Sequence, residues 1–217
     1  GPSAVVVAGK VYLTAAVPKS EDKKADQSLR ALRLDAKTGE AKTLYFECDG
    51  HKLSAPNDLV FDKQGGFYFT DHGYSHERSA ILTGIYYAKA DGSMIKEVVF
   101  PAHEPNGIGL SPDGKTLYWA ETWTGRVMRR RVEGPGQLAE AGMVDTWQCL
   151  YGFPGFQLLD SLAVDGDGNV CVATLVNGGV TVISPKGELV DFFATGDPLT
   201  TNVCFGGPDL KTAYITV

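Results

Sequence analysis

The sequence of 217 residues lacks several features, and each absence excludes a class of protein. No apolar run approaches the roughly 18–20 residues of a membrane-spanning helix, so we expect no membrane partner. The net charge is −6 and the only basic run is the arginine triplet 129–131, which argues against nucleic-acid binding through a broad basic surface. On an alternating strand these arginines face opposite sides, which favours a solvated outer strand. Because no Gly-x-Ser-x-Gly motif is present, we do not expect a serine hydrolase.

Cysteine is scarce, and neither cysteine nor histidine has the spacing of a zinc site. His72 and His76 are four residues apart, but they belong to a loop-like stretch with no third ligand, which favours a surface position. Four cysteines are present and lie far apart, at Cys48, Cys149, Cys171 and Cys204. The last two lie inside apolar segments, so we expect buried, reduced thiols and a cytoplasmic protein.

The pattern that is present predicts an all-β chain with little helix. β-Branched and aromatic residues alternate in segments such as 11–14, 67–70 and 170–173, and no helical period of 3.6 appears. Turn signals stand before or after these segments, among them the Asp-Gly pairs at 113–114 and 167–168. These pairs suit hairpin turns that need a positive φ.

One pattern recurs four times along the chain. A polar residue stands just ahead of an apolar segment and a Gly-containing turn, and the four copies begin about 42 to 54 residues apart, at Asn57, Asn106, Asp160 and Asn202. This spacing, with short strands, is typical of β-propeller blades. At roughly 45 to 50 residues per blade, the chain would hold four to five blades. We expect one propeller domain over 1–217, incomplete at the N-terminus and at the C-terminus, with 21–28 as a mobile polar loop.

The repeated position suggests a chemistry. The innermost strands of a propeller line its central channel, so four residues in phase would form a ring of carboxamide and carboxylate oxygens, with Asp58 and Ser161 beside it. Such oxygens are ligands of hard divalent cations, Ca²⁺ first, with Mg²⁺, Mn²⁺ or Zn²⁺ as alternatives. Any single Asn or Asp could instead satisfy backbone groups at the start of a strand. Four in phase favour the axial site.

Several segments of the chain resemble the gluconolactonase family, also called the senescence marker protein or regucalcin family. The segment from Gly65 to Thr83 looks most like the bacterial drug-responsive lactonases of that family. The other motifs that carry the resemblance are Pro56-Asn57-Asp58, Glu104-Pro105-Asn106-Gly107-Ile108, Leu159-Asp160-Ser161-Leu162-Ala163-Val164-Asp165 and Thr201-Asn202-Val203-Cys204-Phe205-Gly206-Gly207. They cover essentially the whole chain in the family's order.

The resemblance implies a six-bladed β-propeller of the gluconolactonase type that hydrolyses a lactone at one divalent metal. Asn106 and Asp160 match metal ligands of the family, and Asn57 matches a position that binds substrate or metal. Ser161 matches a residue near the metal. Asn202 fits the fourth repeat, without an assigned role.

The proposed chemistry needs a base and a substrate pocket. Asp160 or Asp58 is the candidate general base for a metal-activated water. Around the pocket we expect His103, Tyr74 and Trp123 to contact substrate. The irregular, aromatic-rich segment 147–159 is expected to lie over the pocket mouth and not to form a strand.

The chain departs from the family in one respect. Members take a metal-binding glutamate from a Glu-Gly-Pro-like segment early in the first blade, and no such segment is present. Glu104 and Glu121 are the candidates to replace it. Three hypotheses follow: a lactonase acting on a sugar lactone or similar small lactone, a phosphotriesterase-like hydrolase at the same metal site, and a non-catalytic propeller that binds a partner through its rim.

Overall fold

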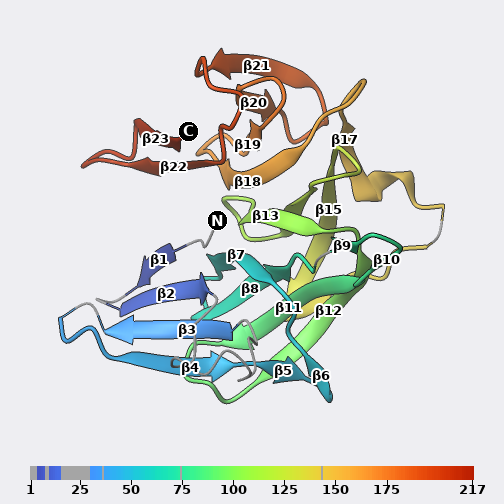
Figure 1. The fold of residues 1–217 in the computed structure, drawn as a ribbon. Helices are drawn as coiled ribbons and strands as arrows, with labels where there is room; N and C mark the ends of the chain where they lie inside the picture. The colour runs from blue at the N-terminus through green and yellow to red at the C-terminus, as the bar shows by residue number, and fades with distance from the viewer. Residues whose placement is uncertain (1–3, 8–9, 16–29, 36, 74, 143) are drawn as a thin grey trace. The chain divides into compact units, whose positions relative to one another are not determined.

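The computed structural model describes residues 4–7, 10–15, 30–35, 37–73, 75–142 and 144–217. It divides into two compact units, Gly1–Glu104 (unit 1) and Pro105–Val217 (unit 2), and each is described by itself. Both are built from antiparallel β-sheets (Figure 1). Among the described residues the only helical element is a single 3-10 turn, η1 at Thr146–Gln148. The expectations of an all-β chain and of little helix are confirmed.

Unit 1 contains two four-stranded antiparallel sheets and two short hairpins. The first sheet has the order β1 (Ala4–Val7), β2 (Lys10–Ala15), β3 (Arg30–Asp35) and β4 (Ala41–Tyr45). The second has the order β7 (Pro56–Phe61), β8 (Gly66–Asp71), β11 (Thr83–Lys89) and β12 (Ile95–Ala102). The hairpins pair β5 (Glu47–Cys48) with β6 (His51–Lys52), and β9 (Ser75–His76) with β10 (Ser79–Ala80). Each large sheet is a simple up-and-down meander (Figure 1).

Aromatic side chains form the core of unit 1. Phe67 and Phe69 stand two residues apart on β8, so they share one face of the sheet. Phe69 stacks on Tyr86 with ring centroids 5.2 Å apart, and Phe67 packs against Tyr12 of the first sheet at 6.3 Å. The alternation read in segment 67–70 therefore places aromatic rings between the two sheets of this unit.

Unit 2 is also built from antiparallel sheets. One sheet contains β13 (Pro105–Leu110), β14 (Thr116–Glu121), β15 (Arg126–Gly134) and β16 (Gln137–Leu138), with β17 (Cys149–Gly152) also paired to β15. The next contains β18 (Leu159–Val164), β19 (Val170–Thr174), β20 (Gly179–Ile183) and β21 (Leu189–Ala194). The last pairs β22 (Asn202–Gly206) with β23 (Thr212–Thr216). Four-stranded antiparallel meanders are the building units of propeller blades, as the repeat predicted.

The predicted turns occur where the sequence indicated them. Gly114 and Gly168 have φ values of 73° and 86°, in the left-handed region that glycine adopts at low cost. Gly178, in the predicted turn before β20, also has a positive φ of 66°. The loop expected at 21–28 lies outside the described residues.

Two predictions were wrong. Cys204 is exposed, because the face of the two-stranded β22–β23 sheet that carries it is not covered by the described residues. Residues 149–152 of the aromatic-rich segment do form a strand, β17, on the edge of β15. All four cysteines have free thiols, as predicted.

The arginine triplet 129–131 contacts the segment that precedes β17. Arg129 lies over the Trp147 ring at 4.2 Å, and its Nε donates a hydrogen bond to the Trp147 carbonyl oxygen at 2.7 Å. Arg131, on the same face, lies 5.2 Å from the same ring. Arg130 faces the other way and donates to Gln148 Oε1 at 3.1 Å. These contacts secure the segment before β17 to β15.

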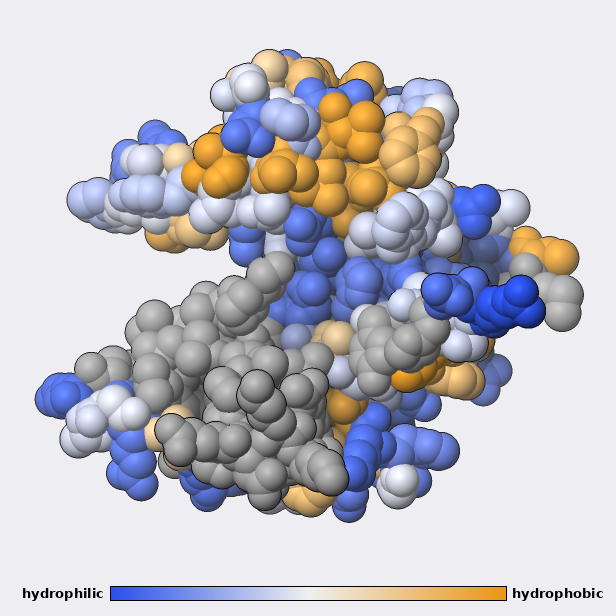
Figure 2. Space-filling model, viewed as in Figure 1, coloured by the Kyte–Doolittle hydropathy of each residue, from blue (hydrophilic) through white to orange (hydrophobic). Residues whose placement is uncertain are grey.

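Apolar side chains are exposed on β21, the outer strand of the β18–β21 sheet. Figure 2 shows apolar atoms gathered on the part of unit 2 that carries β18 to β21. All six residues of β21 are exposed, including Phe192 and Phe193. No helix within the described ranges is both long enough and apolar enough to span a bilayer.

Candidate functional site

The same β-bulge occurs at the predicted polar position in three successive sheets. In β7 and β8, Pro56 pairs with Asp71 and Leu59 with Phe69, so Asn57 and Asp58 together oppose one residue. The shift repeats in β13 and β14, where residues 106 and 107 oppose one residue, and in β18 and β19, where residues 160 and 161 do so. Bulges re-aim side chains and are frequent next to active sites. The repeat seen in the sequence is therefore also a repeat of backbone geometry.

Asn106 is held from its amide nitrogen. The Nδ2 group donates a hydrogen bond to Thr122 Oγ1 at 3.2 Å, and both side chains are buried. The amide oxygen Oδ1 is also buried, and no hydrogen-bond donor of the described residues reaches it. The residue makes other contacts as well. A buried amide oxygen fixed through its own nitrogen is a suitable ligand for a divalent cation.

Gly107 brings the bulges of β13 and β18 together. A Cβ built on Gly107 would lie 2.3 Å from the Leu162 backbone nitrogen and 2.7 Å from Ser161 Cα. A Cβ on Gly109, two residues further along the same face, would meet Leu162 Cδ1 at 2.9 Å. Only glycine permits this approach, which places the β13 bulge against the backbone of the β18 bulge.

The β18 bulge carries Asp160 and Ser161. Ser161 is buried, and its backbone N–H donates to the Thr201 carbonyl oxygen at 3.1 Å. Asp160 is half-buried. Three oxygen-bearing residues predicted as ligands, Asn106, Asp160 and Ser161, thus belong to two adjoining bulges of one unit.

Asn202 departs from the other three copies. Its strand β22 pairs with β23 in continuous register from Asn202 opposite Thr216 onward, without a bulge. Its Oδ1 accepts a hydrogen bond from the Val203 backbone N–H at 2.7 Å. Asn202 thus satisfies a backbone group at the start of its strand, which was the alternative to cation binding for any one of the four repeated residues.

In unit 1, the equivalent bulge carries Asn57 and Asp58. Asp58 is buried, and its Oδ1 accepts a hydrogen bond from the Leu59 N–H at 2.8 Å. Its own backbone N–H donates to Thr70 Oγ1 at 3.1 Å. Asn57 is half-buried, but its Oδ1 atom is buried and no donor of the described residues reaches that atom.

Asp71, which lies opposite Pro56 in the register, was not among the residues predicted from the sequence. Its carboxylate accepts hydrogen bonds from the backbone N–H groups of Ser54, at 2.8 Å, and Ala55. Burial raises the pKa of Asp71, while these N–H groups lower it. Asp71 lies 17 residues from Ser54 and 16 from Ala55, so a local sequence motif could not reveal these contacts.

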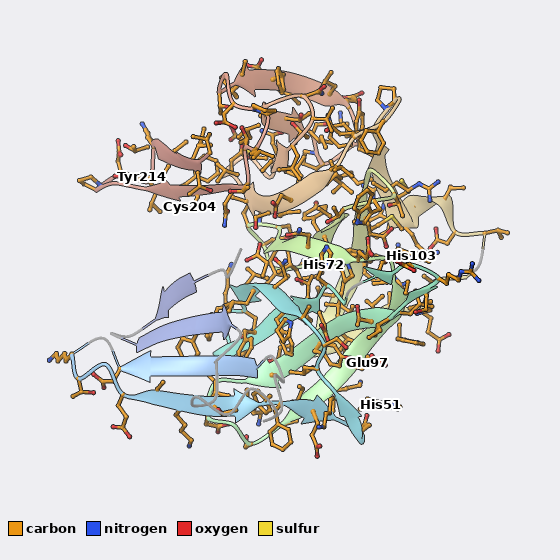
Figure 3. The ribbon with its side chains drawn as sticks, in the orientation of Figure 1. His51, His72, Glu97, His103, Cys204 and Tyr214 are labelled. Atoms are coloured by element: carbon orange, nitrogen blue, oxygen red, sulfur yellow. The ribbon has the colours of Figure 1, made fainter. Side chains whose placement is uncertain are left out.

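The predicted pocket-mouth residues have different placements. Trp123 is exposed to 61% of its surface, and His103 is exposed at the end of unit 1. Figure 3 shows His103 after β12 and His72 after β8. Tyr74 lies outside the described residues.

The two glutamates considered as replacements are both engaged. Glu104 has a left-handed φ of 49°, and its Oε1 accepts a hydrogen bond from Ser75 Oγ at 2.8 Å. Glu121 is buried, and its Oε2 accepts a hydrogen bond from Thr124 Oγ1 at 2.9 Å. The part of the chain that the structure describes contains no group of three or more His, Cys, Asp and Glu side chains arranged for a metal. The oxygens at the unit 2 bulges are therefore mostly neutral.

Unit 1 also contains a cavity of about 490 Å³ that the sequence did not indicate. Asp71, Tyr86 and Glu97 line it together with Ser54 and Phe100. Burial, and then the Glu97 carboxylate, raise the pKa of Tyr86. Figure 3 shows Glu97 on β12 and His51 on β6 in this region of unit 1.

Repeated antiparallel meanders with a polar bulge on the first strand of three sheets define a protein built from propeller-type blades. The family model described as SMP-30/Gluconolactonase/LRE-like region matches residues 9–217. The chain belongs to this family, and the resemblance noted in the sequence is confirmed.

Among curated proteins, the chain is similar to bacterial lactonases. The chain is 38% identical over 133 residues to lactonase drp35 of Staphylococcus epidermidis, a match that covers 60% of this chain and 39% of that protein. The lactonase drp35 of Staphylococcus haemolyticus is 37% identical over 133 residues, with the same coverage. The chain thus spans about two fifths of the length of the curated relatives it matches.

Solved structures share the fold. A calcium-binding protein, regucalcin, from Agrobacterium tumefaciens has a TM-score of 0.75 at 20% identity, covering 98% of this chain and 66% of that one. A gluconolactonase from Xanthomonas campestris has a TM-score of 0.74 at 22% identity, covering 95% and 65%. At these identities the likeness establishes the fold alone.

Proposed function

We propose that this chain is part of a divalent-metal-dependent lactonase that opens the ester of a sugar lactone or similar small lactone. The observation that carries the proposal is the bulge repeated in three sheets, each with an oxygen-bearing side chain at the same place. Asn57, Asn106 and Asp160 occupy equivalent bulge positions, which a backbone role of any one of them does not explain. Relatives named as lactonases give the reaction class.

The cation would be held in unit 2 by Asn106 Oδ1, the Asp160 carboxylate and the Ser161 hydroxyl. These are the hard oxygen donors that Ca²⁺ accepts, with Mg²⁺, Mn²⁺ or Zn²⁺ as alternatives. Thr122 fixes the orientation of the Asn106 amide through Nδ2, and the amide oxygen is the atom that we assign to the cation. When bound, such an ion polarises a lactone carbonyl and lowers the pKa of a water ligand.

The remaining roles fall to carboxylates and amides of the bulges. Asp160 is the first candidate to accept the proton of the attacking water, with Asp58 as the second. Asn57 is the proposed hydrogen-bond partner of the substrate. The roles of Asn57 and Asp58 rest on the repeat and the family resemblance.

The test is turnover with a matched control. A pH-stat assay against a panel of aldonolactones should show hydrolysis that a chelator abolishes and Ca²⁺ restores. Asp160→Asn should lower kcat/KM at least 100-fold, about the size expected for loss of a general base. Asp167→Asn removes an exposed turn carboxylate of the same unit and should leave turnover unchanged.

Two outcomes would replace the proposal. Hydrolysis of an organophosphate ester with no lactone turnover would favour the phosphotriesterase-like reaction. A folded protein that neither binds a cation nor hydrolyses either ester would favour a non-catalytic binding module.

A further inference from the structure

At the start of β7, the Asp71 side chain makes hydrogen bonds to the backbone where regular strand pairing cannot. Pro56 begins the strand opposite Asp71, and proline has no N–H to donate. The Asp71 carboxylate instead accepts the two N–H groups just before the proline, from Ser54 at 2.8 Å and from Ala55. In return, the His72 N–H donates to the Ala55 carbonyl oxygen at 2.9 Å. We call this arrangement the Asp71 clamp.

The clamp is well enclosed. Asp71 is exposed to only 1% of its surface, and the Thr83 hydroxyl donates to its backbone carbonyl oxygen. Hydrogen bonds to a buried carboxylate are about twice as strong as those between neutral groups. The two residues before Pro56 are therefore fixed more firmly than an ordinary loop.

The residues at the same register position in the other bulged sheets make different hydrogen bonds. Glu121 stands opposite Pro105, but its carboxylate accepts from Thr124 Oγ1, at 2.9 Å, and from Trp119 Nε1, at 3.5 Å. Thr174 stands opposite Leu159, and its hydroxyl donates to the Gly179 carbonyl oxygen at 2.9 Å. Thr174 shows that a carboxylate is not needed at this place in every bulged sheet, so the Asp71 contacts concern the start of β7 itself.

Asn57 follows the clamped Ala55 by two residues and occupies the first position of the bulge. Asp58 has supports of its own, through Thr70 and through Leu59. We infer that Asp71 is a positioning residue that fixes Asn57 toward the substrate by clamping the backbone of Ser54 and Ala55. The substrate part of this inference rests on the proposed lactonase function.

Hydrogen exchange tests the clamp directly, whether or not the protein is an enzyme. In Asp71→Ala both N–H groups lose their acceptor, and the amides of Ser54 and Ala55 should exchange at least tenfold faster. Asp71→Asn keeps one acceptor oxygen and should give an intermediate rate. Val99→Ala removes a buried side chain from β12, a strand of the same sheet that does not pair with β7, and should leave these two amides protected. Unchanged exchange at Ser54 and Ala55 in Asp71→Ala would overturn the clamp.

Kinetics test the positioning role. If Asn57 binds substrate, Asp71→Ala should raise KM for the lactone about tenfold, with kcat within twofold and Ca²⁺ affinity unchanged, and Asp71→Asn should recover part of the loss. A merely structural role would lower kcat through the folded fraction and leave KM unchanged, as in Val99→Ala. If the Ser54 and Ala55 amides of Asp71→Ala exchange faster but KM is unchanged, the Asp71 hydrogen bonds are supported and the positioning of Asn57 toward the substrate is overturned. A wild-type protein that hydrolyses no lactone would overturn the proposed function and the substrate role together, while the exchange data would still decide the clamp.

Discussion

Gly107 and Ser161 lie backbone to backbone: a Cβ on Gly107 would come within 2.7 Å of Ser161 Cα. Backbone atoms cannot move aside as a flexible side chain can. The contact between the β13 and β18 bulges therefore depends on the absence of a side chain at position 107. In unit 2 this contact joins the residues proposed to bind the cation.

Gly107→Ala should separate the two bulges. We expect a loss of about 1–3 kcal/mol in the free energy of unfolding, the usual cost of overpacking, and weaker cation binding. Urea denaturation measures the first and calcium titration the second. Gly166→Ala is the control, because a Cβ there meets no atom within 4 Å. Equal effects of the two substitutions would contradict this description of the contact.

Thr122→Val should weaken cation binding without removing a ligand. Valine keeps the shape but cannot accept the hydrogen bond from Asn106 Nδ2, so the amide can rotate. Partners of metal ligands are typically worth 10–100-fold in affinity, and we expect a loss in that range. Thr122→Ser, which retains the hydroxyl, should recover most of it. Identical affinities for the two variants would show that this hydrogen bond does not orient Asn106.

The cysteines should differ in reactivity. Burial raises the pKa of the Cys171 thiol to about 12, whereas Cys204 is exposed. Because the thiolate is the reactive form, a maleimide at pH 7.5 should label Cys204 within minutes and Cys171 only after denaturation. Peptide mass spectrometry distinguishes the two sites, and Cys204→Ser should abolish the fast phase. Rapid labelling of Cys171 in the native protein would contradict its buried placement.

Stability should fall at alkaline pH. Burial raises the pKa values of Cys171 and of the tyrosines Tyr86 and Tyr87, so the folded state keeps these protons after the unfolded state has lost them. The unfolding free energy is therefore unaffected below the ordinary pKa values and decreases as pH rises above them, for Cys171 from about 9 up to about 12. Cys171→Ala should flatten the decrease at its lower end. Denaturation curves between pH 7 and 11 measure it, and a stability that rises over this range would contradict the sign.

The sequence predicted what depends on local pattern. Alternating segments such as 67–70 became strands because β-branched and aromatic side chains fit a half-buried pleated surface. The Asp-Gly pairs became turns because glycine tolerates a positive φ. The repeated polar positions were found for the same reason, since each lies within a few residues of its turn.

Features that depend on contacts between distant parts of the chain could not be predicted from the sequence. A bulge exists only in the register between two strands, so nothing local separated Asn202, which lacks one, from Asn106, which has one. The Asp71 clamp joins residues 16 and 17 positions apart. Strand β17 was missed because it forms through long-range pairing with β15, next to the segment that Arg129 and Arg130 hold.

The central claim is that the β13 and β18 bulges bind a divalent cation through Asn106, Asp160 and Ser161. Calorimetric titration of the metal-stripped protein with CaCl₂ tests it most directly. We predict one Ca²⁺ per chain for the wild type and for Asp167→Asn, and at least 100-fold weaker binding for Asp160→Asn and Asn106→Ala, each checked for native circular dichroism. Folded variants that bind Ca²⁺ as tightly as the wild type would contradict the claim.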